Sequence, residues 1–221
     1  MPFTLVYGDH LTDFPELGDQ MLRDRGTQFV DDLGWQLNTD ALGRELDEYD
    51  SCNPLYLILA DEAGDHVAST RLMPTTGPNM AAKHFSHLTD GVALSSAAIW
   101  ETTRFFVAQK AQRCAAPTLM WAGCEIALRA GVEFYLGVIG AHMERVFTAC
   151  GWKPEVIGRS GEGTNAFCAC LWEVTPEISE RLARKAGIWP GDHALRIHRP
   201  KFTDAREIAS DAIMEKAAIA A

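Results

Sequence analysis

The amino-acid sequence predicts a single α/β domain in which a mixed β-sheet carries helices on both faces. Its 221 residues, 47% of them hydrophobic, are enough to build one large core. Strand-like and helix-like segments follow one another along the chain, and two of the expected strands form a hairpin, which requires antiparallel pairing. We find no internal repeat and no linker. We therefore treat residues 1–221 as one domain, with a peripheral tail from about residue 202.

The N-terminal part predicts a short strand followed by a long amphipathic helix. Residues 3–7 have the pattern of a strand, and residues 13–33 place apolar side chains at helical spacing. Asp13 is expected to cap this helix, because Glu16 follows three residues later and completes a capping-box pattern. Gly34 is expected to end it.

The rest of the chain predicts a hairpin, three further strands and three further helices. The acidic, glycine-containing turn at 61–65 joins the two strands of the hairpin. Pro117 suits the first turn of a helix, and Gly131, Gly151 and Gly187 each end one. The expected strands are 55–59, 67–73, 99–107, 132–139 and 166–174, and the expected helices are 117–130, 141–150 and 176–186.

Composition narrows the classes of function. Residues 1–65 hold 15 of the 30 acidic residues but only three of the 20 basic ones. No basic stripe is present to displace phosphate counterions, so we expect no nucleic-acid partner. The acidic first third suits a cationic ligand, although it is equally well explained as a solvated surface.

The same composition predicts a cytoplasmic protein. No apolar run reaches the length of about eighteen residues that a membrane span needs, and the N-terminus lacks the basic start of a secretory signal. The six cysteines include no Cys-x-x-Cys pair and read as reduced thiols. The histidines do not fall at ligand spacing beside them, so no metal site is expected.

Charged residues inside strand-like segments mark the candidate site. Glu45, Asp47 and Asp50 crowd three carboxylates together, and Arg71 and Arg104 are their natural counter-charges because each lies in an apolar strand. Buried charges persist only when they are paired or functional, so a structural ion-pair cluster and a catalytic one are equally good explanations.

The strand 99–107 adds a further carboxylate. Regular alternation places Glu101, Thr103 and Phe105 on one face and Arg104 on the other, unless a bulge alters the pattern. Glu101 is then free to line a cleft while Arg104 joins the acidic cluster.

A third group combines an arginine with two aromatic rings. Arg25 and Phe29 are four residues apart and share a helix face, and Trp35 lies just beyond the helix. Such a group can bind a ligand with a carboxylate and a flat ring. The alternative is an arginine that extends from a helix packed through its aromatic residues.

These motifs, in this order and spacing, resemble the LuxI-type acyl-homoserine lactone synthases, the autoinducer synthases. The resemblance spans roughly residues 20–110, with weaker support from Met143-Glu144-Arg145 and Gly151-Trp152. It rests on Arg25, Phe29, Trp35, Glu45, Asp47, Asp50, the run from Arg71 to Met80, Glu101, Arg104 and Phe105-Phe106-Val107. It implies an N-acetyltransferase-like (GNAT-like) α/β/α sandwich.

The resemblance also implies a reaction and a set of roles. The α-amine of S-adenosylmethionine attacks an acyl thioester, and the methionine carboxylate then closes the lactone and expels methylthioadenosine. S-adenosylmethionine is a substrate, and no cofactor or metal is needed. Glu101 is the expected base, and Asp47, Asp50, Arg71 and Arg104 form the catalytic network, supported by Glu45. Arg25, Phe29, Trp35, Thr103 and Phe105 are expected to bind S-adenosylmethionine.

The sequence gives weaker evidence for the residues that would bind the acyl chain. Met80, Leu119, Met120, Gly137 and Phe147 are candidates for an acyl pocket, although apolar residues at such spacing also build ordinary core. Family members that make 3-oxo products tend to carry Thr or Ser at the position of Gly137. The resemblance therefore favours an unsubstituted or otherwise modified chain.

The acyl donor is expected to be acyl carrier protein rather than acyl-CoA. Residues 108–113 contain no glycine, so a CoA pyrophosphate has no glycine-rich loop to bind. Basic residues elsewhere could meet an acidic carrier protein or be ordinary surface charges; they are Lys110, Arg113, Arg129, Arg145 and Lys153. Two alternatives stay open: another GNAT-fold N-acyltransferase that uses acyl-CoA, and a non-catalytic sensor of S-adenosylmethionine or an acyl chain.

Overall fold

A computed structural model describes residues 3–163 and 166–188. The tail expected from about residue 202 lies outside the described residues. Within them, no helix is long and apolar enough to cross a membrane.

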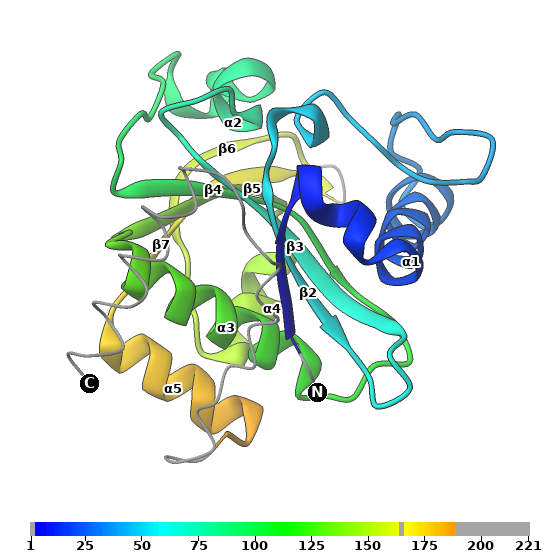
Figure 1. Ribbon diagram of the computed structural model, residues 1–221. Coiled ribbons are helices and arrows are strands. Elements are labelled where there is room, and N and C mark those ends of the chain that lie inside the picture. The colour runs from blue at the N-terminus through cyan, green and yellow to red at the C-terminus, as the bar shows by residue number, and fades with distance from the viewer. Residues whose placement is uncertain (1–2, 164–165, 189–221) are drawn as a thin grey trace.

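A seven-stranded mixed sheet forms the centre of the molecule (Figure 1), in the order β1-β2-β3-β4-β5-β7-β6. All neighbouring strands are antiparallel except β4 and β5, which are parallel. The strands are β1 (Phe3–Tyr7), β2 (Leu55–Ala60), β3 (His66–Pro74), β4 (Ile99–Val107), β5 (Phe134–Gly140), β6 (Glu155–Ser160) and β7 (Phe167–Glu173).

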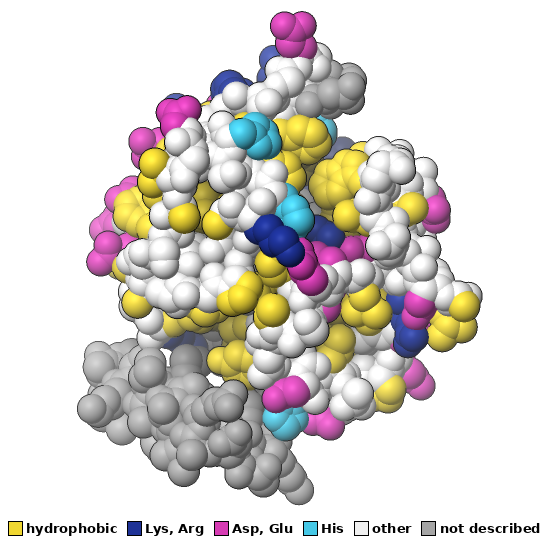
Figure 2. Space-filling model, turned by 90° about the horizontal axis from the view of Figure 1, so that it is seen from above, with side chains coloured by type: hydrophobic (Ala, Val, Ile, Leu, Met, Phe, Trp, Pro, Cys, Tyr) yellow, Lys and Arg dark blue, Asp and Glu magenta, His cyan; other side chains and the backbone are white. Residues whose placement is uncertain are grey.

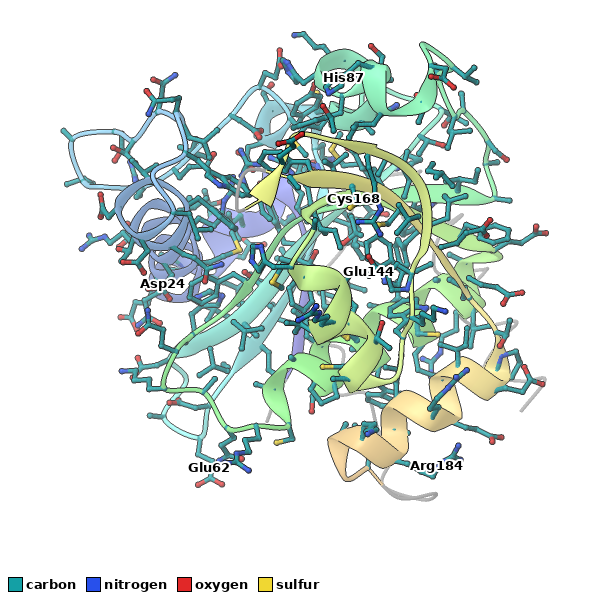
Figure 3. All side chains as sticks on the ribbon, turned by 180° about the vertical axis from the view of Figure 1, so that it is seen from behind. Asp24, Glu62, His87, Glu144, Cys168 and Arg184 are labelled. Atoms are coloured by element: carbon teal, nitrogen blue, oxygen red, sulfur yellow. The ribbon has the colours of Figure 1, made fainter. Side chains whose placement is uncertain are left out.

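Helices cover both faces of this sheet, as the sequence predicts. One face carries α1 (Pro15–Arg25), and the other carries α3 (Ala115–Ala130), α4 (Met143–Cys150) and α5 (Pro176–Ala186). Figure 3, seen from behind, shows Asp24 of α1 and Arg184 of α5 on opposite sides of the molecule.

Alternation along β2 explains how two cores arise. Leu55, Leu57 and Leu59 belong to the large core beneath α3, whereas Tyr56 and Ile58 pack with α1. Every residue of β2 is therefore buried, as its uninterrupted apolar run suggests.

The long helix predicted for residues 13–33 is instead an α-helix, α1, followed by a π-helix. A 3₁₀ helix (Gly8–Asp13) precedes α1, and a π-helix (Gly26–Asp32) follows it. The predicted Asp13 cap is wrong: Phe14 occupies the N-cap position, and the Asp13 carboxylate contacts His10. Pro15 sets the start, because proline suits the first helical turn, where its missing N–H is not needed.

Two short elements escape the sequence analysis. Strand β6 contains Gly158 and is only partly buried, so its residues show little alternation. Helix α2 (Met80–His84) has five residues, too few to display a period. Asn79 caps it by accepting the Ala82 N–H.

Strand β4 has the predicted bounds but not the predicted alternation. Ser69 pairs with Phe106 and Arg71 pairs with Thr103, so β4 holds one extra residue in a β-bulge. Arg104, within that bulge, has a left-handed φ of 53°. Thr103 and Arg104 consequently lie on the same face as Glu101.

Beyond its start, β4 separates from β5. The two strands pair only over Ile99–Glu101 and 134–136, although both continue further. We call the place where pairing ends, after Glu101 and Leu136, the β4–β5 split. Pairing between these two parallel strands therefore ends in the middle of the sheet.

Candidate active site

A buried group of arginines and carboxylates lies on the α1 face of the sheet, and we call it the charged network. Its side chains are at most 5% exposed, except for one carboxylate, Asp47, at 18%. The members are Arg25, Arg71, Arg104, Glu45, Asp47 and Asp50.

Glu45 joins two of the arginines. Arg25 Nε donates to Glu45 Oε2 at 2.7 Å, and Arg104 donates through Nε at 3.0 Å and through Nη2 at 2.8 Å. The Glu45 side chain is fully buried. From its loop, Glu45 thus links α1, through Arg25, to β4, through Arg104.

The two aspartates each bind an arginine through two bonds. Arg25 donates to Asp50 at 2.9 and 3.0 Å, and Arg71 donates to Asp47 at 2.5 and 2.9 Å. Arg104 Nη2 also reaches Asp47 at 2.9 Å. The prediction that Arg71 and Arg104 are the counter-charges is confirmed.

Local sequence explains why the acidic loop lies here. Asp47 Oδ1 accepts the backbone N–H groups of Tyr49 and Asp50 at 2.9 and 3.2 Å, which folds the loop upon itself. Just before the acidic residues, the loop contacts the helical segment at Gly26, where a Cβ would lie 2.2 Å from the Gly43 carbonyl oxygen. Only glycine lets the loop approach the helix so closely.

The network is electrically balanced by its own members, three positive against three negative. Burial alone would raise the pKa of Asp50, but the hydrogen bond and charge of Arg25 and the charge of Arg71 outweigh it. The pKa of this carboxyl is therefore held well below its usual range, and Asp50 is ionised.

Glu101 differs from the network carboxylates because no arginine hydrogen-bonds to it. It is 1% exposed and accepts the Met80 N–H at 2.9 Å and the Ala81 N–H at 2.6 Å, the first amides of α2. Burial raises the pKa of Glu101, against the lowering effect of these two amides and of the Arg71 charge. Each carboxylate oxygen keeps an acceptor position for a further proton donor.

The aromatic group is assembled differently from the prediction. Arg25 is 1% exposed and directs its donors to Glu45 and Asp50, so it belongs to the network and not to an open ligand site. Phe29 and Trp35 do stack, with ring centroids 5.0 Å apart. The Arg104 guanidinium lies 5.7 Å from the Phe29 ring centroid.

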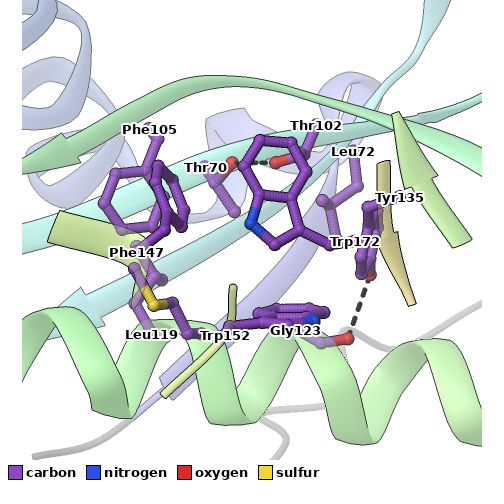
Figure 4. Close-up of a pocket in the computed structure, with 11 residues that line it drawn as sticks. Thr70, Leu72, Thr102, Phe105, Leu119, Gly123, Tyr135, Phe147, Trp152 and Trp172 are labelled. Atoms are coloured by element: carbon purple, nitrogen blue, oxygen red, sulfur yellow. Dashed lines mark hydrogen bonds between the residues drawn. The ribbon is translucent and has the colours of Figure 1, made fainter. Parts of the chain in front are cut away.

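An apolar cavity of about 30 Å³ lies on the opposite face of the sheet, above α3 (Figure 4). Three of the predicted acyl-pocket residues, Leu119, Met120 and Phe147, line it. The full lining is Thr70, Leu72, Thr102, Phe105, Leu119, Met120, Gly123, Tyr135, Phe147, Trp152 and Trp172.

Three predicted residues have other positions. Phe105 lines this cavity and packs on Phe147, on the face away from the charged network, because the bulge shifts the alternation. Met80 lies on the network side, where its sulfur is 3.8 Å from Arg104 Nη1. Gly137 is a neighbour of the cavity: a Cβ there would meet the Trp172 ring and the Thr102 carbonyl oxygen at 3.1 Å.

The two sites meet at the β4–β5 split. Glu101 and Thr103 face the charged network, where Thr103 Oγ1 accepts a bond of 3.0 Å from Arg71 Nε. Thr102, between them in sequence, faces the cavity. Figure 2 shows acidic and basic side chains gathered in a recess between two lobes on the face seen from above.

Sequence reasoning missed several contributors. Tyr56 donates its hydroxyl to Asp50 at 2.5 Å, and the Tyr49 ring lies 5.5 Å from the Arg71 guanidinium carbon. Tyr56 on β2 pairs directly with Arg71 on β3, so the two side chains lie on the same face of the sheet. The register of the predicted hairpin is therefore the signal that could have found Tyr56. Trp172 gives no signal in the sequence beyond its hydrophobicity, and Trp152 gives only weak support for the family resemblance.

A family model described as autoinducer synthase matches residues 11–182. The chain belongs to the autoinducer synthase family. It is 34% identical over 166 residues to an acyl-homoserine-lactone synthase of Rhizobium etli, a match covering 72% of this chain and 78% of the relative. It is thus an acyltransferase of the acyl-homoserine lactone synthase class.

Solved structures agree with this assignment. The CoA-dependent acyl-homoserine lactone synthase MesI has 26% identity and a TM-score of 0.76, over 86% of this chain and 97% of that one. TofI, in a ternary complex with an inhibitor and MTA, has 25% identity and a TM-score of 0.69, over 86% and 98%. The predicted GNAT-like fold is confirmed by the sheet order and by these matches.

Proposed function

We propose that this synthase acylates S-adenosylmethionine from an acyl thioester and then closes the lactone, releasing methylthioadenosine. One observation carries the proposal: a balanced charged network and an apolar cavity lie on opposite faces of the sheet, with Glu101 at the split between them. A polar, cationic amine substrate suits the first site and an acyl chain suits the second. The MTA bound by the similar protein TofI supports the choice of amine substrate.

In the first step Glu101 accepts a proton from the ammonium group of S-adenosylmethionine. The freed amine attacks the thioester carbonyl, an amide bond forms, and the thiolate leaves and takes up the second amine proton. A raised pKa suits this role, because a base works best when its pKa lies closer to the working pH.

In the second step a carboxylate oxygen of the acylated substrate attacks its own γ-carbon. The C–S bond breaks and its electron pair neutralises the sulfonium, so the leaving group is a neutral thioether. This step needs no base, and the protein contributes by holding the chain bent for ring closure.

The network positions the amine substrate. Asp47 is its most exposed carboxylate and would face the ammonium group, with Arg71 and Arg104 holding Asp47 in place. Arg25 acts through Glu45 and Asp50 and does not touch the substrate. The half-buried Trp35, supported by Phe29, offers an aromatic surface for the sulfonium or the adenine.

The acyl donor is proposed to be acyl carrier protein. In the segment 108–113, the Ala108 and Ala111 amides donate to the carbonyl oxygens of Val67 and Ala108, so they are not free to bind a pyrophosphate. The similar protein MesI is CoA-dependent, which instead favours acyl-CoA as the donor. A comparison of kcat/KM for acyl carrier protein and CoA thioesters of one chain length decides between them.

The proposal is tested with purified protein, S-adenosylmethionine and acyl thioesters, with mass spectrometry of the products. We expect an acyl-homoserine lactone and methylthioadenosine in equal amounts. Glu101→Gln should retain binding of S-adenosylmethionine and lose acyl transfer. Full acyl transfer by a folded Glu101→Gln protein would remove that residue from the mechanism.

Two other outcomes identify the alternatives. Binding of S-adenosylmethionine without turnover of any acyl thioester would indicate a sensor. Acylation of simple amines from acyl-CoA, with no lactone, would indicate another N-acyltransferase.

A further inference from the structure

Glu101 is positioned by backbone N–H groups that a single side chain organises. Its carboxylate accepts the Met80 N–H at 2.9 Å and the Ala81 N–H at 2.6 Å. Both amides lie in the first turn of α2, which Asn79 caps by accepting the Ala82 N–H at 2.9 Å. Helix α2 has five residues, and so short a helix is not stable through its own hydrogen bonds. The direction of the two amides therefore depends on Asn79.

Asn79 also ties the start of α2 to the strand that carries Glu101. Its Nδ2 donates to the carbonyl oxygens of Thr75 and Gly77 at 3.2 Å each. Thr75 in turn donates to the Ile99 carbonyl oxygen, through its hydroxyl at 2.9 Å and its backbone N–H at 3.1 Å. Ile99 begins β4, the strand of Glu101. The hydrogen bonds thus form a closed ring that runs from β4 through Thr75, Asn79 and α2 back to the Glu101 carboxylate.

The loop that carries Asp47 reaches the same point. Tyr49 donates its hydroxyl to the Asn79 carbonyl oxygen at 3.4 Å, and Asp47 Oδ1 accepts the Tyr49 N–H at 2.9 Å. Asn79 is 7% exposed, and both ends of its side-chain amide are hydrogen-bonded within the protein. It therefore connects Asp47 and Glu101, the two carboxylates proposed to face the amine substrate, without binding the substrate itself.

The ionisable groups around Glu101 make its proton affinity sensitive to the α2 amides. Burial raises the pKa of Glu101, and the two amides oppose it most, followed by the Arg71 charge from β3. The Asp47 charge raises the pKa further, and Tyr49 from the same loop also faces the Glu101 charge. The basic side chains of α2 pair with Glu48 instead. Weakening the two amide bonds should therefore raise the pKa of Glu101.

We propose that Asn79 is a positioning residue for acyl transfer, which holds the first amides of α2 against Glu101 and thereby fixes where that carboxylate meets the amine substrate. The inference rests on the proposed function. A base must lie within hydrogen-bond reach of the proton it takes, and a small displacement of a catalytic group lowers the rate strongly. Without the cap the α2 amides turn away, so the carboxylate loses its orientation and part of its stabilisation as an anion.

The test compares the wild type with Asn79→Ala, Asn79→Ser and Thr175→Ala, using the acyl thioester that the wild type turns over best. Serine is as good an N-cap as asparagine, so Asn79→Ser keeps the capping acceptor. Thr175→Ala is the matched control, because Thr175 caps α5 on the other face of the sheet by accepting the Ile178 N–H at 3.3 Å. The measurements are kcat, KM for S-adenosylmethionine, the pH profile of kcat/KM and the melting temperature.

We expect Asn79→Ala to lower kcat about tenfold while KM for S-adenosylmethionine changes less than about twofold. The acid limb of its pH profile should move about one pH unit upward, because the carboxylate stays buried but loses hydrogen bonds to its charged form. Asn79→Ser should restore most of kcat. Thr175→Ala should lower the melting temperature, as any lost cap does, and leave kcat and the pH profile unchanged.

The outcomes separate the two proposals. If a folded Asn79→Ala protein keeps the wild-type kcat and acid limb, or if Thr175→Ala moves them equally, the role of Asn79 is overturned while acyl transfer stands. An Asn79→Ser protein as impaired as Asn79→Ala overturns it too, since the cap is then not what matters. Should Asn79→Ala not fold, Asn79→Gly decides in its place, because glycine is tolerated at an N-cap yet has no side chain to accept a bond. If the wild type forms no lactone from any acyl thioester, both the proposed function and this inference fail.

Discussion

Replacing Glu45 with glutamine should destabilise the protein strongly, although the side chain hardly changes shape. The wild-type carboxylate is fully buried and accepts bonds of 2.7, 3.0 and 2.8 Å from Arg25 and Arg104. In Glu45→Gln one oxygen becomes an amide NH₂ that faces guanidinium donors, and the network keeps three positive groups against two negative ones.

The magnitude follows from what is left behind. Breaking a buried ion pair by removing one partner costs about 3–5 kcal/mol, because the remaining charge stays buried without compensation. A domain has only about 5–15 kcal/mol of stability in total. For a chain of this size the loss corresponds to a fall in Tm of about 6–20 °C.

Urea unfolding followed by circular dichroism measures the effect, with Glu180→Gln as the control. Glu180 pairs with Arg184 on the surface of α5, where its side chain is 74% exposed, and such pairs contribute about 0.3–0.5 kcal/mol. A loss below about 1 kcal/mol for Glu45→Gln would refute the reasoning, because it would mean that the network does not depend on its charge balance.

Three further predictions concern pH and the cavity. Burial raises the pKa of Glu101, so kcat/KM should fall as the pH is lowered through that raised value, and a pH profile with no acid limb would contradict the role of base. The Arg25 and Arg71 charges hold the pKa of Asp50 in the folded protein below its usual range. The stability that this interaction provides is therefore fully present above the ordinary aspartate pKa of about 3.9. It is lost as the pH falls toward the pKa that Asp50 has in the folded protein. Acid unfolding should accordingly be shallower in Asp50→Asn, and an unchanged acid limb would argue against this linkage. Leu119→Ala should cost about 2–5 kcal/mol of stability and raise the ratio of kcat/KM for long against short acyl donors, and an unchanged ratio would show that the chain does not reach this wall.

The parts of the fold that sequence predicts well are those with a strong period or a strong terminator. The apolar hairpin and the helix expected over residues 117–130 agree with the observed β2, β3 and α3 to within two residues, because glycines and prolines bound them. The segment 13–33 is predicted less well, since its apolar spacing continues through the change from α- to π-helix at Gly26. At that point the chain contacts the acidic loop, and a Cβ on Gly26 would lie 2.2 Å from the Gly43 carbonyl oxygen. That contact joins residues distant in sequence, and local periodicity carries no sign of it.

The same distinction applies to the site. Charges in apolar strands are conspicuous, so sequence predicts Arg71 and Arg104 as counter-charges of the acidic cluster. Arg25 lies on a helix, where an arginine is unremarkable, so its bond to Glu45 is not predicted. The position of Phe105 is not predicted either, because a single extra residue in β4 reverses the face of every side chain after it. The indole N–H of Trp172 is buried and has no acceptor among the described residues, a feature that no one-dimensional pattern shows.

The β4–β5 split also bears on how a turnover ends. In the proposed reaction, the finished product would have its lactone ring on the network side of the sheet and its tail in the cavity on the other. The tail would then have to be withdrawn past Thr102 and Gly137 before the next acyl donor enters. Each added methylene lengthens that path and adds apolar surface to be returned to water. Chain length would therefore set the speed at which the enzyme clears its product as well as the choice of substrate.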